Sequence, residues 1–141
     1  MEIIEFEMFG LHLQEPMALI TNWMIASFAF YAFFSIKKNE SPFKNYWKTF
    51  YMVLGISMIF GGLGHLLFQY WGIPGKFPSW TLGILAGIFS SYAMISAWPN
   101  QQQQIQFRRF VLIKALLLLT LAITTRKFLF VAIDTTLAYL I

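Results

Sequence analysis

His65, one of two histidines in the chain, lies in the apolar stretch GGLGHLLFQY, where an imidazole could bind a metal, exchange a proton or hydrogen-bond to another helix. On a helix, residues four apart share a face, so Ser57, Gly61, His65 and Gln69 form one stripe. Lipid cannot pair with a hydroxyl, an imidazole or an amide, so this stripe should face protein. Two interpretations follow: a hydrogen-bonded histidine in a packed interface, or a functional histidine, because polar groups inside membranes concentrate at functional sites.

Glycines surround this histidine and provide room beside its ring. Gly61, Gly62 and Gly64 lack side-chain bulk, so another helix or a ligand can approach the ring closely. The next apolar stretch offers a matching surface in Gly83-x-x-x-Gly87. These five glycines are therefore the predicted helix-packing positions.

A second group of polar residues lies at the start of the first apolar run. Glu15 precedes Pro16, and Asn22 follows within two turns. A carboxylate at the N-terminus of a helix gains about 0.3–1 kcal/mol from the helix dipole, so capping is the simpler role for Glu15. The alternative is that Glu15 and Asn22 belong to a binding site, with His12 nearby at the same end of the helix.

Asp134 lies inside an apolar run and needs either a partner or a proton. The structural interpretation is a hydrogen bond to Thr120, Thr124 or another helix. Counting 1.5 Å per residue from the expected helix ends puts Asp134 and His65 each about 9 Å below the same, outer surface of the membrane. The candidate polar pocket therefore opens outward and consists of six residues, namely His65, Gln69, Asp134, Glu15, Asn22 and His12.

The composition indicates which elements must position these residues. Of 141 residues, 58% are hydrophobic and only 11% are charged, whereas a soluble domain has about 25% charged residues. The missing charge predicts an integral membrane protein in contact with the lipid bilayer. The absence of cysteine excludes disulfides, thiolate metal sites and covalent c-type haem. The net charge of +4 comes from basic residues between apolar runs, a pattern of membrane topology and not of nucleic-acid binding.

Apolar runs predict the fold class, an all-α polytopic transmembrane helix bundle in a single domain. The expected helices span about 17–36, 50–71, 80–98, 110–124 and 128–141. Four are read as full helices. The fifth reaches only about 21 Å, short of the ~30 Å hydrocarbon core, so it either stops inside the bilayer against partners or belongs to a longer chain.

Basic residues in the loops predict the orientation in the membrane. One side carries six of them: Lys37, Lys38, Lys44, Lys48, Arg108 and Arg109. The other side carries three beside the acidic N-terminus: Lys76, Arg126 and Lys127. Because short cytoplasmic loops carry the excess of Lys and Arg, the N-terminus is expected outside, in a bacterial inner membrane.

Two short motifs resemble those of a known group of proteins. EPMALITN enters the first helix and GGLGH lies in the second. They resemble the E-P-x4-T-D and G-G-x-x-H motifs of an uncharacterised family of bacterial multi-pass membrane proteins. This chain has Asn22 where that family usually has aspartate.

More distantly, an acidic residue before the first helix and a histidine late in the second are similar to the alkaline ceramidase and adiponectin-receptor superfamily. That resemblance implies a zinc-dependent amide hydrolase of seven helices, with His65 as a metal ligand. Gly61 stands where those enzymes have a serine ligand, and the H-x-x-x-H pair of their last helix is absent from this chain.

Two functional classes remain open. No nucleotide-binding, serine-hydrolase or H-E-x-x-H motif is present, and His12 lies outside the first helix while His65 lies within the second, which argues against haem. The favoured function is a non-catalytic subunit or scaffold of a membrane assembly, in contact with other transmembrane helices of the same or another protein. The alternative is a zinc-dependent membrane hydrolase.

Overall fold

A computed structural model describes residues 5–8, 10–37 and 40–139. It begins with a β-hairpin, followed by helices of very different lengths. The elements are β1 (Glu5–Met8), β2 (Leu11–Gln14), α1 (Pro16–Ser35), α2 (Pro42–Leu66), α3 (Phe68–Trp71), the 3₁₀ helix η1 (Ile73–Lys76), α4 (Phe77–Ser96), α5 (Gln101–Thr125) and α6 (Leu129–Ala138).

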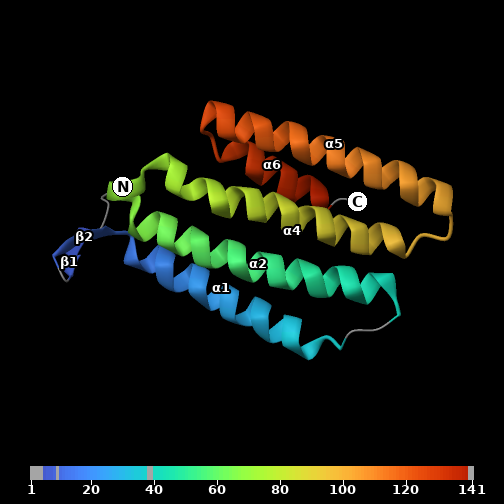
Figure 1. The fold of residues 1–141 in the computed structure, drawn as a ribbon, viewed down its shortest axis with the longest axis horizontal. Coiled ribbons are helices and arrows are strands. Elements are labelled where there is room, and N and C mark those ends of the chain that lie inside the picture. Colours follow the sequence, from blue (N-terminus) through green and yellow to red (C-terminus); the bar gives the residue numbers. More distant parts are fainter. Residues whose placement is uncertain (1–4, 9, 38–39, 140–141) are drawn as a thin grey trace.

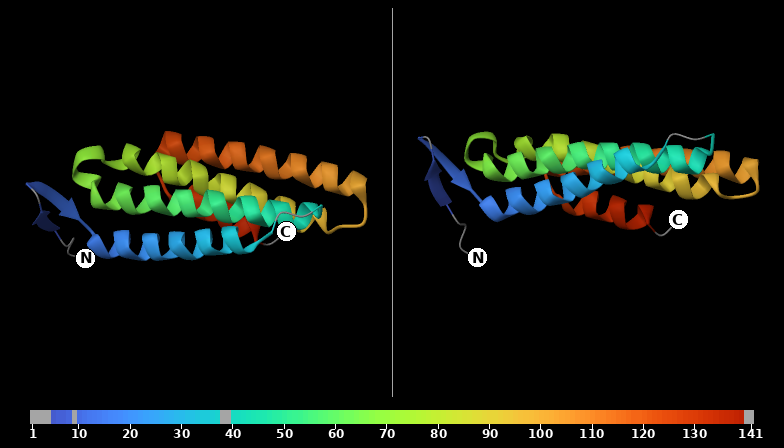
Figure 2. Two further views of the ribbon diagram at one scale, coloured as in Figure 1. Left: turned by 60° about the horizontal axis from the view of Figure 1, so that its bottom comes forward. Right: turned by 90° about the horizontal axis from the view of Figure 1, so that it is seen from below.

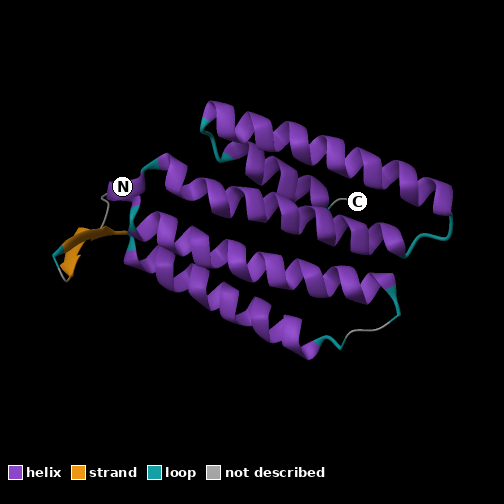
Figure 3. Ribbon diagram, viewed as in Figure 1, coloured by secondary structure: helices purple, strands orange, loops and turns teal. Residues whose placement is uncertain are grey.

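The long helices form an antiparallel bundle, which confirms the all-α fold class. Helix α2 packs between α1 and α4, and α5 and α6 pack against α4 and against each other (Figure 1). Helices α1 and α6 lie on the same side of the layer formed by α2, α4 and α5 (Figure 2). Short loops join the helices, and the hairpin extends beyond one end of the bundle (Figure 3).

The bundle buries small side chains and exposes large apolar ones. On α1, Ala26 and Ala29 are buried, whereas Phe28, Tyr31 and Phe34 are each at least 67% exposed. Small residues let helices approach closely where there is no hydrophobic driving force between them. A compact apolar cluster joins α4, α5 and α6; it consists of Trp80, Ile84, Ala115, Ala122 and Val131.

Three stretches of the described chain are helices long and apolar enough to span a membrane: Pro16–Ser35, Pro42–Leu66 and Ile73–Ser96. The four expected full helices are present as α1, α2, α4 and α5, but α5 is not among these three stretches. Helix α5 is 25 residues long but carries Arg108, Arg109 and Lys114 in addition to its glutamines. Helix α6 has 10 residues and would cover only about 15 Å.

Two helices begin earlier than their charge-free runs. Helix α2 begins at Pro42 and not at 50, because Pro42 occupies the first helical turn, where a missing N–H costs nothing. Helix α5 begins at Gln101 and not at 110. The side chain of Asn100 accepts hydrogen bonds from the backbone N–H groups of Gln102 and Gln103, and glutamine is a good helix former. The expected glutamine linker is therefore helical.

The hairpin was not expected. Strands β1 and β2 pair antiparallel, with Glu7 opposite His12, and Gly10 in the turn has a φ of +75°. The backbone N–H of His12 donates to the Tyr70 hydroxyl at 3.1 Å, which attaches the hairpin to α3. Lys38 of the expected cytoplasmic loop and residues 140–141 of the expected fifth helix lie outside the described residues.

Candidate functional site

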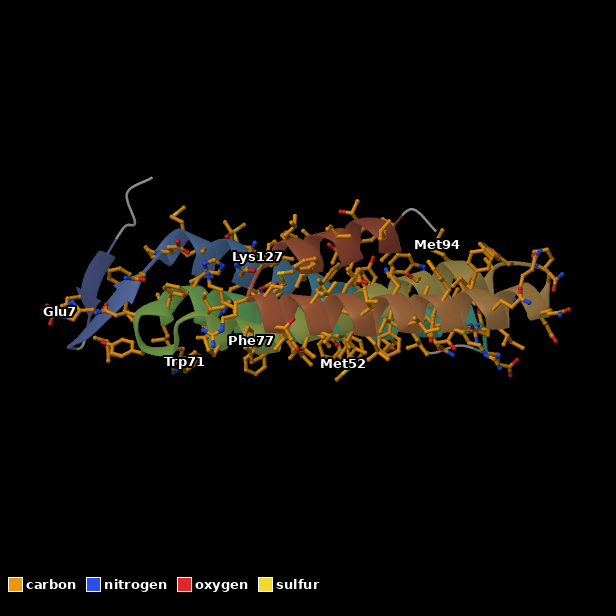
Figure 4. The ribbon with its side chains drawn as sticks, turned by 90° about the horizontal axis from the view of Figure 1, so that it is seen from above. Glu7, Met52, Trp71, Phe77, Met94 and Lys127 are labelled. Carbon is orange, nitrogen blue, oxygen red and sulfur yellow. The ribbon has the colours of Figure 1, made fainter. Side chains whose placement is uncertain are left out.

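A cavity of about 500 Å³ lies where α1, α2 and α4 meet the turn between α5 and α6. Its polar lining consists of Asn22, His65, Lys76, Ser79 and Arg126. The remaining lining is Met58, Gly61, Phe68, Ile73, Trp80 and Phe128. Figure 4 shows Trp71, Phe77 and Lys127 toward the end of the bundle from which the hairpin extends, and we call this end the hairpin end.

His65 lies in the last turn of α2 and is paired with Glu15. Its Nδ1 contacts Glu15 Oε2, so the ring and the carboxylate form a hydrogen-bonded ion pair when the imidazole is protonated. In the neutral ring, an Nδ1–H that donates to Glu15 leaves the lone pair on Nε2. The side chains are 34% and 42% exposed, so water reaches both groups.

Glu15 reaches His65 from an unusual backbone conformation. It is the residue before α1 and has φ 49° and ψ 56°, in the left-handed region, and its side chain caps none of the helix amides. This conformation costs a residue with a Cβ about 1–3 kcal/mol, and such residues concentrate at functional sites. The capping role expected for Glu15 is therefore replaced by a contact with His65.

Lys76 is brought to His65 by a tight turn between α2 and α4. A Cβ on Gly64 would lie 2.9 Å from the carbonyl oxygen of Gly75, so only glycine allows this contact. As a result, Lys76 Nζ lies 3.4 Å from His65 Nδ1 and 4.7 Å from the centroid of the Phe68 ring. The ammonium therefore lies beside the imidazole and over an aromatic face.

Asn22 of α1 and Ser79 of α4 both reach the cavity beside Gly61 of α2. A Cβ on Gly61 would lie 3.0 Å from Ser79 Oγ and 3.2 Å from Asn22 Oδ1. The Asn22 amide donates to the Ala18 carbonyl at 2.7 Å, which turns its oxygen away from its own helix. Gly61 thus lets α1 and α4 bring two polar side chains together at the surface of α2.

Arg126, in the turn between α5 and α6, completes the polar lining of the cavity. It ends α5 in the left-handed conformation, with φ 55°, and the chain then reverses into α6. Phe128 in the same turn lies against Trp80, with ring centroids 6.0 Å apart. Glu15 and Arg126 are the two residues other than glycine with positive φ in the described part of the chain, and both belong to this site.

The charges of the site do not balance. Lys76 and Arg126 each carry a positive charge, His65 adds a third when protonated, and Glu15 supplies one negative charge through its contact with His65. The cavity is therefore cationic. An Arg fork and a Lys ammonium are the groups that bind phosphates and carboxylates.

Comparison with known families places the chain in context. A family model described as a family of unknown function (DUF6962) matches residues 17–141. The chain belongs to this family. No curated protein and no solved structure matches the chain significantly.

The match agrees with the expectation of an uncharacterised family. The matched range, residues 17–141 of this chain, includes every residue that lines the cavity, whereas Glu15 precedes it. The distant resemblance to alkaline ceramidases has no counterpart in this match and stays a prediction.

The structure separates the residues expected in the pocket. His65, Asn22 and Glu15 lie together, with Glu15 reaching the cavity through His65. Gln69 does not share a face with His65, because α2 ends at Leu66 and Gln69 lies on α3 with an exposed side chain. His12 is exposed on β2.

Asp134 lies elsewhere, at the centre of the bundle. Its Oδ1 is 3.0 Å from Lys114 Nζ, and Lys114 also donates to its backbone carbonyl at 3.1 Å. Asp134 Oδ2 would lie 3.3 Å from a Cβ on Gly87. At 1.5 Å per residue, Gly87 is about 16 Å further along α4 than Lys76. The expected equal depth of His65 and Asp134 is therefore wrong.

The error in depth has a structural cause. Because α2 ends at Leu66, His65 lies in the last turn of its helix and not about 9 Å inside it. Phe128, taken as the outer end of the last helix, lies level with Trp80, inside α4. The turn between α5 and α6 is therefore deeper than the turn between α2 and α4.

The predicted packing glycines contact different partners. Gly62 lies against Leu19 and Trp23 of α1, and Gly64 lies against the turn at Gly75. Gly83 faces Ser57 of α2, whereas Gly87 faces Asp134 and Ala138 of α6. The Gly83-x-x-x-Gly87 pair thus contacts two helices and not one.

Sequence reasoning missed Lys76, Ser79 and Arg126 as site residues. The sequence indicated Lys76 and Arg126 only as basic loop residues that predict membrane topology, although their loops were expected on the same side as Glu15. That shared side was the signal for a cationic pocket at this end.

Proposed function

We propose that the chain is a non-catalytic subunit of a membrane assembly, and that the pocket beside His65 binds an anionic group. The observation that supports it best is the convergence of Lys76, Arg126 and His65 on one cavity. The groups that line the cavity carry more positive than negative charge in total. An anion bound there would replace the water around them. Its hydrogen bonds to charged donors would each contribute about 1.5–3 kcal/mol.

The lining suits recognition of a phosphate or a carboxylate. Arg126 can present two parallel N–H donors, and Lys76 supplies a mobile point charge. The Ser79 hydroxyl and the Asn22 amide add uncharged polar groups. Glu15 orients the His65 ring, so that its Nε2 can donate to the anion when the ring is protonated.

The alternative, a zinc-dependent hydrolase, fits these residues less well. The Lys76 ammonium lies 3.4 Å from His65 Nδ1, where it would repel a divalent cation bound to the same ring. No group of three or more His, Cys, Asp or Glu side chains that could hold a metal ion is found among the described residues. The donor set therefore favours an anion.

Integral membrane placement is part of the proposal. It is supported by the three apolar helices and by the large apolar side chains on the outer faces of the bundle. The face of α5 that carries Leu112, Ile113, Leu116 and Leu117 is exposed, and it suits lipid or a neighbouring transmembrane helix in a homo- or hetero-oligomer.

Accessibility labelling tests the proposed orientation, with the N-terminus outside. The chain has no cysteine, so single substitutions Glu40→Cys and Lys127→Cys give clean signals. In intact cells, a membrane-impermeant maleimide should label position 127 and not position 40. Labelling of position 40 alone would show that the orientation is the opposite of the proposed one.

Titration of glycerol phosphate into detergent-purified protein tests the binding function. The wild-type chain should bind it saturably, and added salt should weaken binding because the pocket charges are partly exposed. Lys76→Met and Arg126→Gln should each weaken binding about tenfold or more. The matched control is Lys127→Met, which removes an exposed charge that does not line the cavity. No saturable binding by the wild-type chain, or equal losses in Lys127→Met and Lys76→Met, would contradict the proposal.

A further inference from the structure

We propose that the anion is the phosphate headgroup of a single-chain lipid, and that its tail lies in a groove between α2, α4 and α6. This inference rests on the proposed function of the pocket and adds the chemical class of its ligand. It comes from a second cavity that adjoins the first.

The two cavities are adjacent. The second has a volume of about 260 Å³ and shares four lining residues with the polar pocket: Met58, Ser79, Trp80 and Phe128. Trp80 and Phe128 lie against each other at this junction. A ligand with its polar end beside His65 would pass these two rings to place its tail in the second cavity.

The second cavity changes in character along the bundle. Beyond the junction its lining is mainly apolar and includes Leu54, Gly83 and Val131, and its far end is at Tyr139. From Ser79 to Gly87 it extends about 12 Å along α4 at 1.5 Å per residue. One end of the combined space is thus cationic, and the rest is an apolar groove.

The groove has free space beside Gly83. The nearest atom to a Cβ on Gly83 is Ser57 Oγ at 3.7 Å, an ordinary contact, so the groove here has room that no neighbouring side chain fills. An α-helix is about 10 Å or more across and is too large for a space of about 260 Å³. A hydrocarbon chain can.

Charge and shape together identify the ligand class. Lys76 and Arg126 match a phosphate monoester, which carries a charge of about −1.5 to −2 at neutral pH. A free phosphate or glycerol phosphate would occupy only the polar end. An alkyl phosphate would occupy both ends and keep its tail out of water.

The test uses dodecyl phosphate with a photoreactive diazirine near the end of its tail. The full chain is reconstituted in nanodiscs of phosphatidylcholine, irradiated, and mapped by mass spectrometry of its peptides. Adducts should concentrate on α6 (Leu129–Ala138) and on the α4 peptide that contains Gly83, several-fold above those on the exposed face of α5. A probe with the same tail and a neutral maltoside headgroup should label these regions no more than the α5 face.

Two variants locate the effect. Lys76→Met/Arg126→Gln should reduce the α6 adducts of the phosphate probe to the level of the neutral probe. Gly83→Phe should also reduce them, because its ring fills the groove, while the affinity for glycerol phosphate stays unchanged. Gly83→Ala is the matched control and should change neither measurement.

The outcomes separate the two proposals. If glycerol phosphate binds but the phosphate and neutral probes label α6 equally, the lipid inference is wrong and the anion pocket stands. If glycerol phosphate fails to bind the wild-type chain, the pocket proposal itself is wrong. The comparison of the two probes needs no variant, so it holds even if Gly83→Phe fails to fold.

Discussion

Within the described residues, opposite charges pair in two regions, and the two pairs differ in burial and in surroundings. Lys114 and Asp134 join α5 to α6 with side chains that are 9% and 1% exposed. His65 and Glu15 join α2 to the start of α1 with side chains that are 34% and 42% exposed. The first pair lies inside the bundle, and the second lies beside an open cavity at the hairpin end.

The difference indicates separate roles. In the buried pair, one ammonium meets one carboxylate, and the charges cancel where water and ligands cannot reach them. At the hairpin end, the positive charges of Lys76 and Arg126 outnumber the single negative charge of Glu15. The backbones of Glu15 and Arg126 are also held in strained, positive-φ conformations. A balanced, enclosed pair has a structural role, because the loss of one partner leaves the other charge buried and unpaired, whereas unbalanced, accessible charges are available to a ligand.

The largest expected effect is on the buried pair. Asp134→Leu leaves the Lys114 ammonium buried without its partner and should lower the free energy of unfolding by about 3–5 kcal/mol. The double variant Lys114→Met/Asp134→Leu should recover most of this loss, because no charge stays buried. Unfolding in mixed detergent–SDS micelles, followed by circular dichroism, measures both. A single-variant loss below about 1 kcal/mol would show that this pair does not hold α6 in place.

The next effect concerns the turn that brings Lys76 to His65. Gly64→Ala places a Cβ 2.9 Å from the backbone oxygen of Gly75, which cannot rotate away, and should cost about 1–3 kcal/mol of unfolding free energy. Gly83→Ala is the matched control, since its Cβ would meet only an ordinary contact at 3.7 Å. Equal stabilities of the two variants in the same unfolding assay would mean that the tight contact at Gly64 is not required.

The smallest effect on stability is expected at Glu15, and it separates stability from binding. Glu15→Gln removes the charge of a partly exposed pair and should lower the free energy of unfolding by less than about 1 kcal/mol. Because Glu15 is the carboxylate of a cationic site, the same substitution should increase the affinity for glycerol phosphate. Titration and unfolding of one variant check both signs. A large loss of stability, or weaker binding, would contradict the division of roles.

The fold class was predictable because long apolar runs with few charges have few stable alternatives in a membrane. Helix ends were less predictable, since they depend on local capping and not on hydropathy. Pro42 and Asn100 start their helices inside segments whose charge or polarity suggested loops. The hairpin had a signal in the alternation of residues 5–14, but it lies before the apolar runs.

The candidate site was predictable only in part. His65, Asn22 and Glu15 come together because each lies near the same end of a long helix. The depth of Asp134 was not predictable from residue counts, because the turns between helices lie at different levels. Lys114 and Asp134 carried a signal that was missed, since each is a lone charge in an apolar run and opposite charges in neighbouring helices tend to pair.

Binding of glycerol phosphate to two charge-depleted variants tests the central claim most directly. Lys76→Met/Arg126→Gln and Lys114→Met/Asp134→Leu each change two charged residues, one set in the pocket and the other in the buried pair. Isothermal titration of both, beside the wild-type chain, should show binding lost in the first variant and kept in the second. Equal affinities in the two variants would contradict the assignment of the hairpin end as the binding site.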